Sequence, residues 1–154
     1  EELDLDAIYY CPHYPEGTRP EYRARCLCRK PEPGLFYRAA AEWGVSLAHS
    51  WYIGDVLADV EAGNRAGCRT VLIDLGTEAV PTTAIQSPTF VARNLPHAAR
   101  LILAADGHIR RPVEPLPLSA LARPPLTLGS LNPGDLRPIP HAQWVTLAAQ
   151  VGVP

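Results

Sequence analysis

The stretch "SWYIGDVLADVEAGNRAGCRTVLIDLG" at residues 50–76 predicts the fold of this 154-residue chain. It opens with a short apolar run that ends at Gly54-Asp55, and a helical pattern follows as far as Gly67. It closes with "TVLIDLG", a continuous apolar run before a glycine, which is typical of a strand buried on both faces. A strand, a helix and a second strand in this order indicate a parallel sheet with right-handed crossovers, and thus an α/β domain.

The neighbouring segments continue this pattern on both sides. Pro33-Gly34 starts a helical pattern that Gly44 ends as a C-cap. Further along, "TFVAR" at 89–93 predicts a shorter strand, and "LPHAARLILAADG" at 95–107 predicts a closing helix. The apolar positions of the first of these helices are Leu35, Phe36, Ala39, Ala40 and Trp43.

The two ends of the chain have a different character. Upstream, "ELDLDAIYYCP" at 2–12 predicts the end of a helix and then a short extended segment. Residues 11–33 contain five prolines and a glycine, so we expect no regular element there. We expect the folded domain to occupy residues 1–107. Residues 108–154 contain nine prolines, which predicts a linker or tail, or the start of another domain.

The composition is that of a globular protein, with 47% apolar and 19% charged residues. A formal net charge of −2 argues against a nucleic-acid or membrane surface that acts through bulk electrostatics. No apolar run approaches the ~18 residues that cross a bilayer, and no signal peptide opens the chain, so the expected compartment is the cytoplasm. The chain contains no methionine, so we expect it to be a processed product or a fragment.

Four residues of the irregular segment have the spacing of a metal site. Cys11 and His13 form one pair, Cys26 and Cys28 form a second, and twelve residues separate the pairs. Because residues i and i+2 of an extended chain project to the same side, each pair can bind one ion. Three thiolates and one imidazole make a tetrahedral set that zinc accepts with no open position, as in structural sites. The alternative is a set of unrelated thiols with a surface histidine. Cys68 stands apart and reads as an ordinary buried thiol.

Two further features suit a phosphate ester. Asp55 follows a predicted strand, and ligands of open α/β sheets collect at the carboxyl ends of the strands. A carboxylate there suits Mg²⁺, although Asp55 is equally placed to be a helix N-cap. Asp59 follows four residues later on the predicted helix. The pair Arg29-Lys30 comes directly after the last metal ligand, where it either meets a phosphate or forms a solvated basic pair.

Several motifs together resemble a known family. They are "CPHYPEG" at 11–17, "CLCRKPEPGL" at 26–35, "YIGDVLADVEAGNRAG" at 52–67 and the strand end "IDLG". The chain is similar over residues 5–106 to the haloacid-dehalogenase superfamily, subfamily IIIA. Within it, the D-glycero-D-manno-heptose-1,7-bisphosphate 7-phosphatase group, which is related to histidinol phosphatases, is the best match. The resemblance implies a Rossmann-like parallel sheet, a sugar-phosphate substrate, catalytic Mg²⁺, structural zinc, and a place in the synthesis of the heptose precursor of bacterial lipopolysaccharide.

The resemblance also implies roles for individual residues. The four Cys and His residues would hold zinc, Lys30 would neutralise the transferring phosphoryl group, Arg29 would recognise the sugar phosphate, and Asp55 would complete the Mg²⁺ site. The family's nucleophile and acid/base are two Asp of a D-x-D-G-T segment that this chain does not contain. The family's phosphate-binding Thr or Ser is absent as well, and Val56 stands where the family often has a Lys.

Three expectations follow from the missing segment. We expect an N-terminally truncated domain that is inactive alone, and a strand at 50–54 with an open, aggregation-prone edge. We expect the full-length protein to be a monomer. Two alternatives stay open: a histidinol-phosphate phosphatase, and a zinc-stapled module without catalysis. The predicted tail leaves room for a second activity, for which the sequence gives no motif.

Overall fold

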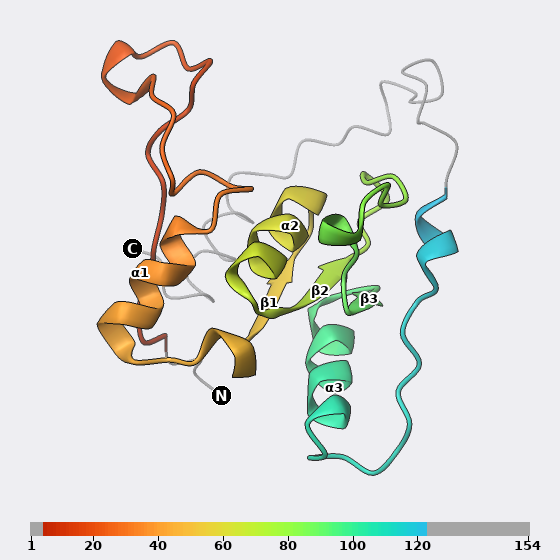
Figure 1. The fold of residues 1–154 in the computed structure, drawn as a ribbon. Helices are drawn as coiled ribbons and strands as arrows, with labels where there is room; N and C mark the ends of the chain where they lie inside the picture. Colours follow the sequence, from red (N-terminus) through yellow and green to blue (C-terminus); the bar gives the residue numbers. More distant parts are fainter. Residues whose placement is uncertain (1–4, 123–154) are drawn as a thin grey trace, which may run out of the picture. The chain divides into compact units, whose positions relative to one another are not determined.

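A computed structural model describes residues 5–122, and one packed unit begins at Tyr9 and includes the described residues that follow it. Three strands form one sheet in the order β1-β2-β3, and both pairs are parallel. The strands are β1 (Trp51–Gly54), β2 (Arg69–Ile73) and β3 (Phe90–Ala92), and the helices are α1 (Gly34–Trp43), α2 (Leu57–Ala66) and α3 (Leu95–Ala105) (Figure 1). The parallel α/β sheet predicted from the sequence is therefore confirmed.

Glycines end two of the helices, as the sequence indicates. Gly44 follows α1 with a φ of 66°, and Gly67 follows α2 with a φ of 85°. Both lie in the left-handed region, where a residue with a Cβ atom is strained. The same two glycines therefore fix where the chain leaves each helix and turns toward β1 and β2.

The core lies on both faces of the sheet. Val71 and Leu72 are adjacent in β2, so their fully buried side chains point to opposite faces. Leu72 packs with residues of α2 and β3, and Val71 packs with residues of β3 and α3. The prediction of a strand buried on both faces is thus confirmed. Among residues 5–122, no helix is long and apolar enough to cross a membrane.

The described residues before Cys11 have no regular secondary structure. Residues 5–12 form neither helix nor strand, and residues 2–4 of the predicted helix end lie outside the described part of the chain. An extended segment becomes a strand only when a neighbouring strand accepts and donates its backbone hydrogen bonds. The described sheet has β1 at one edge, with no strand beyond it. The aggregation expected of this edge stays a prediction.

The packed unit also extends past the boundary expected at residue 107. The backbone N–H of Leu116 donates to the carbonyl oxygen of Val91 over 2.8 Å, next to β3. Leu121 is 2% exposed and packs with Leu72 and Val91. The proline content of this segment indicated a linker, but Leu116 and Leu121 pack against one face of the sheet. The rest of the predicted linker lies outside the described residues.

Leu121 offers a direct test that residues 108–122 belong to the domain. We expect Leu121→Ala to lower the free energy of unfolding by about 2–4 kcal/mol, because a fully buried leucine loses its contacts and leaves a cavity. Urea denaturation gives the value. Leu118→Ala, three residues earlier and 41% exposed, is the matched control and should cost under about 1 kcal/mol. Equal values for the two variants would contradict the packing described here.

Candidate metal and phosphate site

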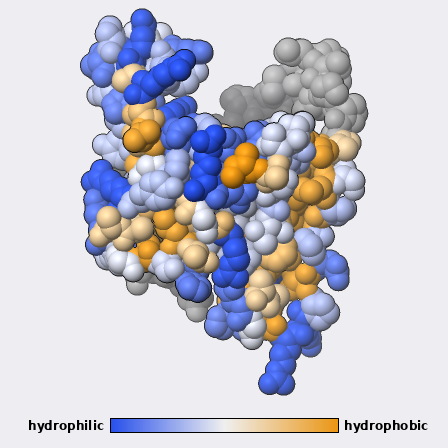
Figure 2. Space-filling view, in the orientation of Figure 1, coloured by the Kyte–Doolittle hydropathy of each residue, from blue (hydrophilic) through white to orange (hydrophobic). Residues whose placement is uncertain are grey.

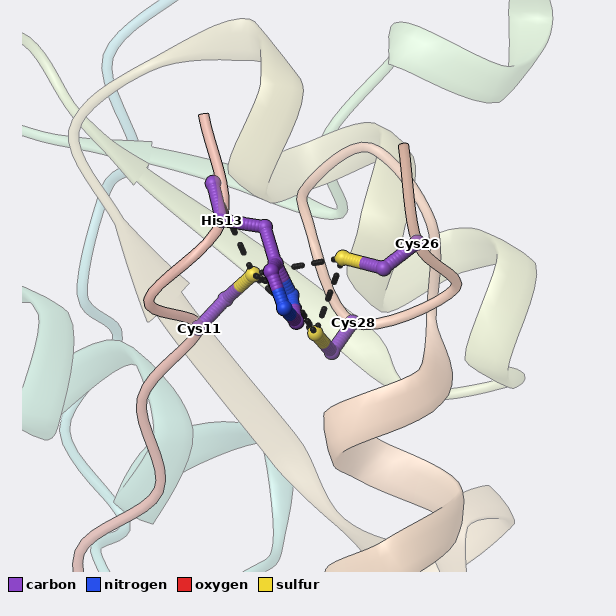
Figure 3. A group of neighbouring side chains, drawn as sticks. All are labelled: Cys11, His13, Cys26 and Cys28. Atoms are coloured by element: carbon purple, nitrogen blue, oxygen red, sulfur yellow. Dashed lines mark hydrogen bonds between the residues drawn. The ribbon is translucent and has the colours of Figure 1, made fainter. Parts of the chain in front are cut away.

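The loop between residues 11 and 33 brings the four predicted metal ligands together. The Sγ atoms of Cys11 and Cys26 lie 3.4 Å apart, and that of Cys28 lies 3.0 Å from each of them. The Nδ1 atom of His13 lies 3.9 Å from the Cys11 sulfur and 3.7 Å from the Cys28 sulfur. The four side chains point toward one another (Figure 3), and all four ligand atoms lie within 4.8 Å of each other.

This arrangement fits a tetrahedral metal ion. Zinc–sulfur bonds of about 2.3 Å at tetrahedral angles place neighbouring sulfurs about 3.8 Å apart. The sulfur–sulfur separations in the cluster are 3.0–3.4 Å, somewhat shorter than that value, and all four ligand atoms lie within the span of a single ion. Three sulfurs and one imidazole leave no position for water or substrate, so the donor set is that of a structural site. The cluster is half-buried, at the base of a loop that has almost no regular structure.

Hydrogen bonds between the thiols already favour one thiolate. The hydrogen bond from Cys28 lowers the pKa of Cys26 to about 6. The pKa of Cys28 rises to about 12, first because it hydrogen-bonds Cys11 and then because it hydrogen-bonds Cys26. The Cys26 thiolate is thus stabilised by hydrogen bonds from the neighbouring thiols. A metal ion removes the remaining protons, because thiolates are the ligands of zinc.

Lys30 reaches from the end of this loop to helix α2. Its ammonium group forms an ion pair with Asp59, a residue of the first helical turn that is 3% exposed. Lys30 also donates to the hydroxyl of Tyr52 over 3.4 Å, and that hydroxyl donates to Asp59 over 3.4 Å. Partial burial is the largest single effect and lowers the pKa of Lys30, but the hydrogen bonds and negative charge of Asp59 and Tyr52 together outweigh it, so the pKa is raised overall. Lys30 therefore stays charged at neutral pH.

Asp55 lies at the carboxyl end of β1 with its side chain exposed. Its backbone N–H donates to the Oδ2 atom of Asp59 over 3.2 Å. The N-cap of α2 is Val56, so the alternative reading of Asp55 as a helix N-cap is wrong. A carboxylate from a distant loop binds the start of the helix instead, because Glu78 accepts from the N–H of Leu57 over 2.8 Å. The Asp55 carboxylate is left available to a cation.

Arg29 and Lys30 both line two hollows. One of about 700 Å³ is lined by both residues together with Tyr52 and Val56, and another of about 460 Å³ is lined by both residues and Arg25. The guanidinium of Arg29 stacks 5.0 Å from the centre of the Tyr14 ring. Hydrophilic residues gather on the loop between residues 11 and 33, at the upper left of Figure 2. Lys30 is thus held by its ion pair and Arg29 by its ring contact, while both residues are exposed to solvent.

Sequence reasoning missed the importance of Asp59 and Tyr52. Asp59 looked like one polar residue of an amphipathic helix. A Cβ atom on Gly54 would come within 2.3 Å of the Asp59 Cβ atom, so Gly54 makes room for this carboxylate. The glycine directly before Asp55 is therefore the one local signal that a side chain packs closely at the end of β1.

Comparisons with known proteins agree with these motifs. A family model described as HAD-hydrolase-like matches residues 27–98. The chain is 38% identical over 93 residues to a D-glycero-beta-D-manno-heptose-1,7-bisphosphate 7-phosphatase of Photorhabdus laumondii, covering 60% of this chain and 50% of that protein. It is 48% identical over 73 residues to the protein of that name from Haemophilus ducreyi, covering 47% of this chain and 40% of the relative.

A solved structure is similar as well. The crystal structure of a D,D-heptose 1,7-bisphosphate phosphatase from B. bronchiseptica, complexed with magnesium and phosphate, matches with a TM-score of 0.50 and 30% sequence identity. The match covers 66% of this chain and 54% of that one. The chain spans about half the length of the curated relatives it matches.

Proposed function

We propose that this chain forms the metal-loop half of a phosphomonoester hydrolase of the haloacid-dehalogenase-like kind, which the family model over residues 27–98 and the named relatives support. The substrate is D-glycero-D-manno-heptose 1,7-bisphosphate, which loses its 7-phosphate on the route to nucleotide-activated heptose for lipopolysaccharide. The curated relatives named for this reaction support the substrate. The attacking aspartate belongs to a segment that the 154 residues do not contain.

One observation carries the proposal: Lys30 from the metal loop and the Asp59 carboxylate from the first turn of α2 meet at the carboxyl end of β1. The Lys30 ammonium group forms an ion pair with the Asp59 carboxylate, and the backbone N–H of Asp55 donates a hydrogen bond to the same carboxylate. Ligands of open parallel sheets bind at this end of the strands. Apart from the nucleophile, a phosphoryl-transfer site acts mainly through positioned cations, which stabilise the charge of the transferred group.

Each residue has a distinct role in this proposal. Lys30 neutralises charge on the transferring phosphoryl group, and the stacked Arg29 orients the sugar phosphate. The exposed Asp55 carboxylate binds Mg²⁺, for which carboxylate oxygens and phosphate oxygens are the preferred ligands. Mg²⁺, when bound, offsets negative charge on the phosphate oxygens.

Zinc in the cluster of Cys11, His13, Cys26 and Cys28 has a structural role in the proposal. The closed donor set supports this role, because no position is left for a reacting water. A reducing compartment keeps such thiols free to bind metal, which supports a place in the cytoplasm.

We expect the isolated 154-residue chain to release no phosphate, because its nucleophile is missing. The measurement is phosphate release from heptose 1,7-bisphosphate and from histidinol phosphate with Mg²⁺. The isolated chain is compared with the gene product that contains it in its natural sequence context. That longer protein should act on the bisphosphate and lose at least a hundredfold in kcat/KM in Lys30→Ala, an effect of the size seen when a charge-stabilising group is removed.

Two results would contradict the proposal. Turnover by the isolated chain that Asp55→Asn abolishes would show that the missing aspartate is not needed. A preference of the longer protein for histidinol phosphate would replace the substrate and keep the reaction class.

A further inference from the structure

Helix α1 contacts both arms of the metal loop, one at each of its ends. We propose that α1 is a template that positions the two ligand pairs relative to each other before a metal ion binds. Gly34, the first residue of α1, is in close backbone contact with the turn that carries Cys26 and Cys28. Tyr9, bound at the other end of α1, holds the arm that leads to Cys11. The inference rests on the metal site of the proposed function.

The contact at Gly34 is made between backbones. The N–H of Gly34 donates to the carbonyl oxygen of Leu27 over 2.8 Å, and Leu27 lies between the two cysteines of the second ligand pair. A Cβ atom on residue 34 would lie 2.3 Å from the Leu27 carbonyl oxygen, 2.7 Å from its carbon and 3.2 Å from the Cys28 nitrogen. These are backbone atoms of the ligand turn, which cannot rotate away as a flexible side chain can. Any side chain at position 34 therefore pushes this turn off the helix.

The contact at Tyr9 is made by four side chains that we call the Tyr9 clasp: Tyr9, Arg38, Glu42 and Trp43. The Tyr9 hydroxyl donates to Glu42 over 2.6 Å and accepts from the indole N–H of Trp43 over 2.9 Å. Arg38 donates to the same Glu42 over 2.7 Å, and its guanidinium lies 5.5 Å from the centre of the Tyr9 ring. Tyr9 precedes Cys11 by two residues, so this network fixes the entry of the first ligand pair.

The two attachments act on one rigid element. A helix of ten residues is about 15 Å long and keeps the distance between its ends. Between the ligand pairs, the loop has one short 3₁₀ turn, at Pro20–Tyr22, and a backbone hydrogen bond of 2.8 Å from Tyr14 to Tyr22 that joins its two arms, and α1 adds a longer, rigid constraint on the distance between the pairs. A site whose ligands are already in place loses less conformational entropy on binding, so it binds more tightly. The template should therefore raise the affinity for zinc.

The test measures metal affinity and geometry rather than activity. Zinc affinity of the 154-residue chain is measured by competition with a chromophoric chelator, and Co²⁺ absorption reports whether the bound site is tetrahedral. Tyr9→Phe removes only the hydroxyl and should lower zinc affinity about fivefold, the effect of one or two hydrogen bonds. Gly34→Ala should lower it about a hundredfold and alter the Co²⁺ spectrum, because the ligand turn itself moves.

Two matched controls separate this effect from a general loss of stability. Tyr10→Phe changes the neighbouring tyrosine, which is 77% exposed, and should leave zinc affinity within twofold. Gly67→Ala strains the end of a different helix, α2, where the φ is 85° and no atom lies within 4 Å of the new methyl group. It should lower thermal stability but leave zinc affinity and the Co²⁺ spectrum unchanged.

Every outcome decides the question. If Tyr9→Phe matches Tyr10→Phe and Gly34→Ala matches Gly67→Ala, the template is overturned while the metal site stands. If Gly34→Ala does not fold, Tyr9→Phe and Trp43→Phe decide, because each removes one member of the Tyr9 clasp: weaker zinc binding supports the template, and unchanged binding overturns it. If the wild-type chain binds neither Zn²⁺ nor Co²⁺, the metal site fails and the template fails with it.

Discussion

Replacing Cys28 by serine (Cys28→Ser) is expected to lower the zinc affinity of this chain by about a thousandfold. Structural zinc sites in small domains contribute about 10–16 kcal/mol of apparent binding free energy, so one of four ligands accounts for about 3–4 kcal/mol. Cys28 is the most central ligand, because its sulfur lies 3.0 Å from the sulfurs of both Cys11 and Cys26. Chelator competition measures the affinity directly.

The same variant should loosen the loop and spare the sheet. Residues 11–33 contain one 3₁₀ turn and a few backbone hydrogen bonds, so the metal is the main constraint on their shape. The two core clusters consist of residues of the strands, α2 and α3, together with Leu121. Neither cluster contains a metal ligand. Hydrogen exchange should rise in residues 11–33 and stay slow in β2.

Cys68 provides the matched control for this experiment. It is a buried thiol, and among the described residues it lies outside the metal cluster. Cys68→Ala should leave zinc stoichiometry at about one per chain and the affinity unchanged. A Cys28→Ser protein that binds zinc as tightly as the wild type would show that the four residues do not share an ion.

The regular elements of this domain could be predicted because local signals agree with the tertiary structure. Gly44 and Gly67 end the helices where the apolar spacing ends, and the apolar run of β2 is buried on both faces. The metal cluster could be predicted because its ligands lie in two short pairs within one irregular segment. In these cases the sequence neighbours of a residue determine its structure.

The remaining features depend on contacts between distant segments. The partners of Asp59 are Lys30, 29 residues earlier in the chain, and Tyr52 on the adjoining strand. Leu121 joins the core from a proline-rich segment whose composition indicates a linker. Tyr9 and Tyr10 have the sequence of a strand but have no neighbouring strand among the described residues. Composition and periodicity carry no information on any of these pairings.

Replacing Asp59 by asparagine (Asp59→Asn) is expected to lower the free energy of unfolding by about 2–3 kcal/mol, since charged hydrogen bonds of a buried group are lost. The carboxylate accepts from the Lys30 ammonium and the Tyr52 hydroxyl through Oδ1 and from the Asp55 N–H through Oδ2. An amide has one accepting oxygen. In either orientation of the new amide, its NH₂ group therefore faces a donor, and Lys30 loses its counter-charge.

A second ion pair on helix α2 shows whether burial is the reason. Glu32 lies 3.6 Å from Arg65 of this helix, and the two side chains are 42% and 41% exposed. Glu32→Gln should cost under about 1 kcal/mol in the same urea titration, because exposed pairs contribute little. Equal losses in the two variants would mean that the Asp59 carboxylate is exposed to water in solution. Lys30 would then have no fixed position from which to meet a phosphate, and the site proposed at the end of β1 would lose its central cation.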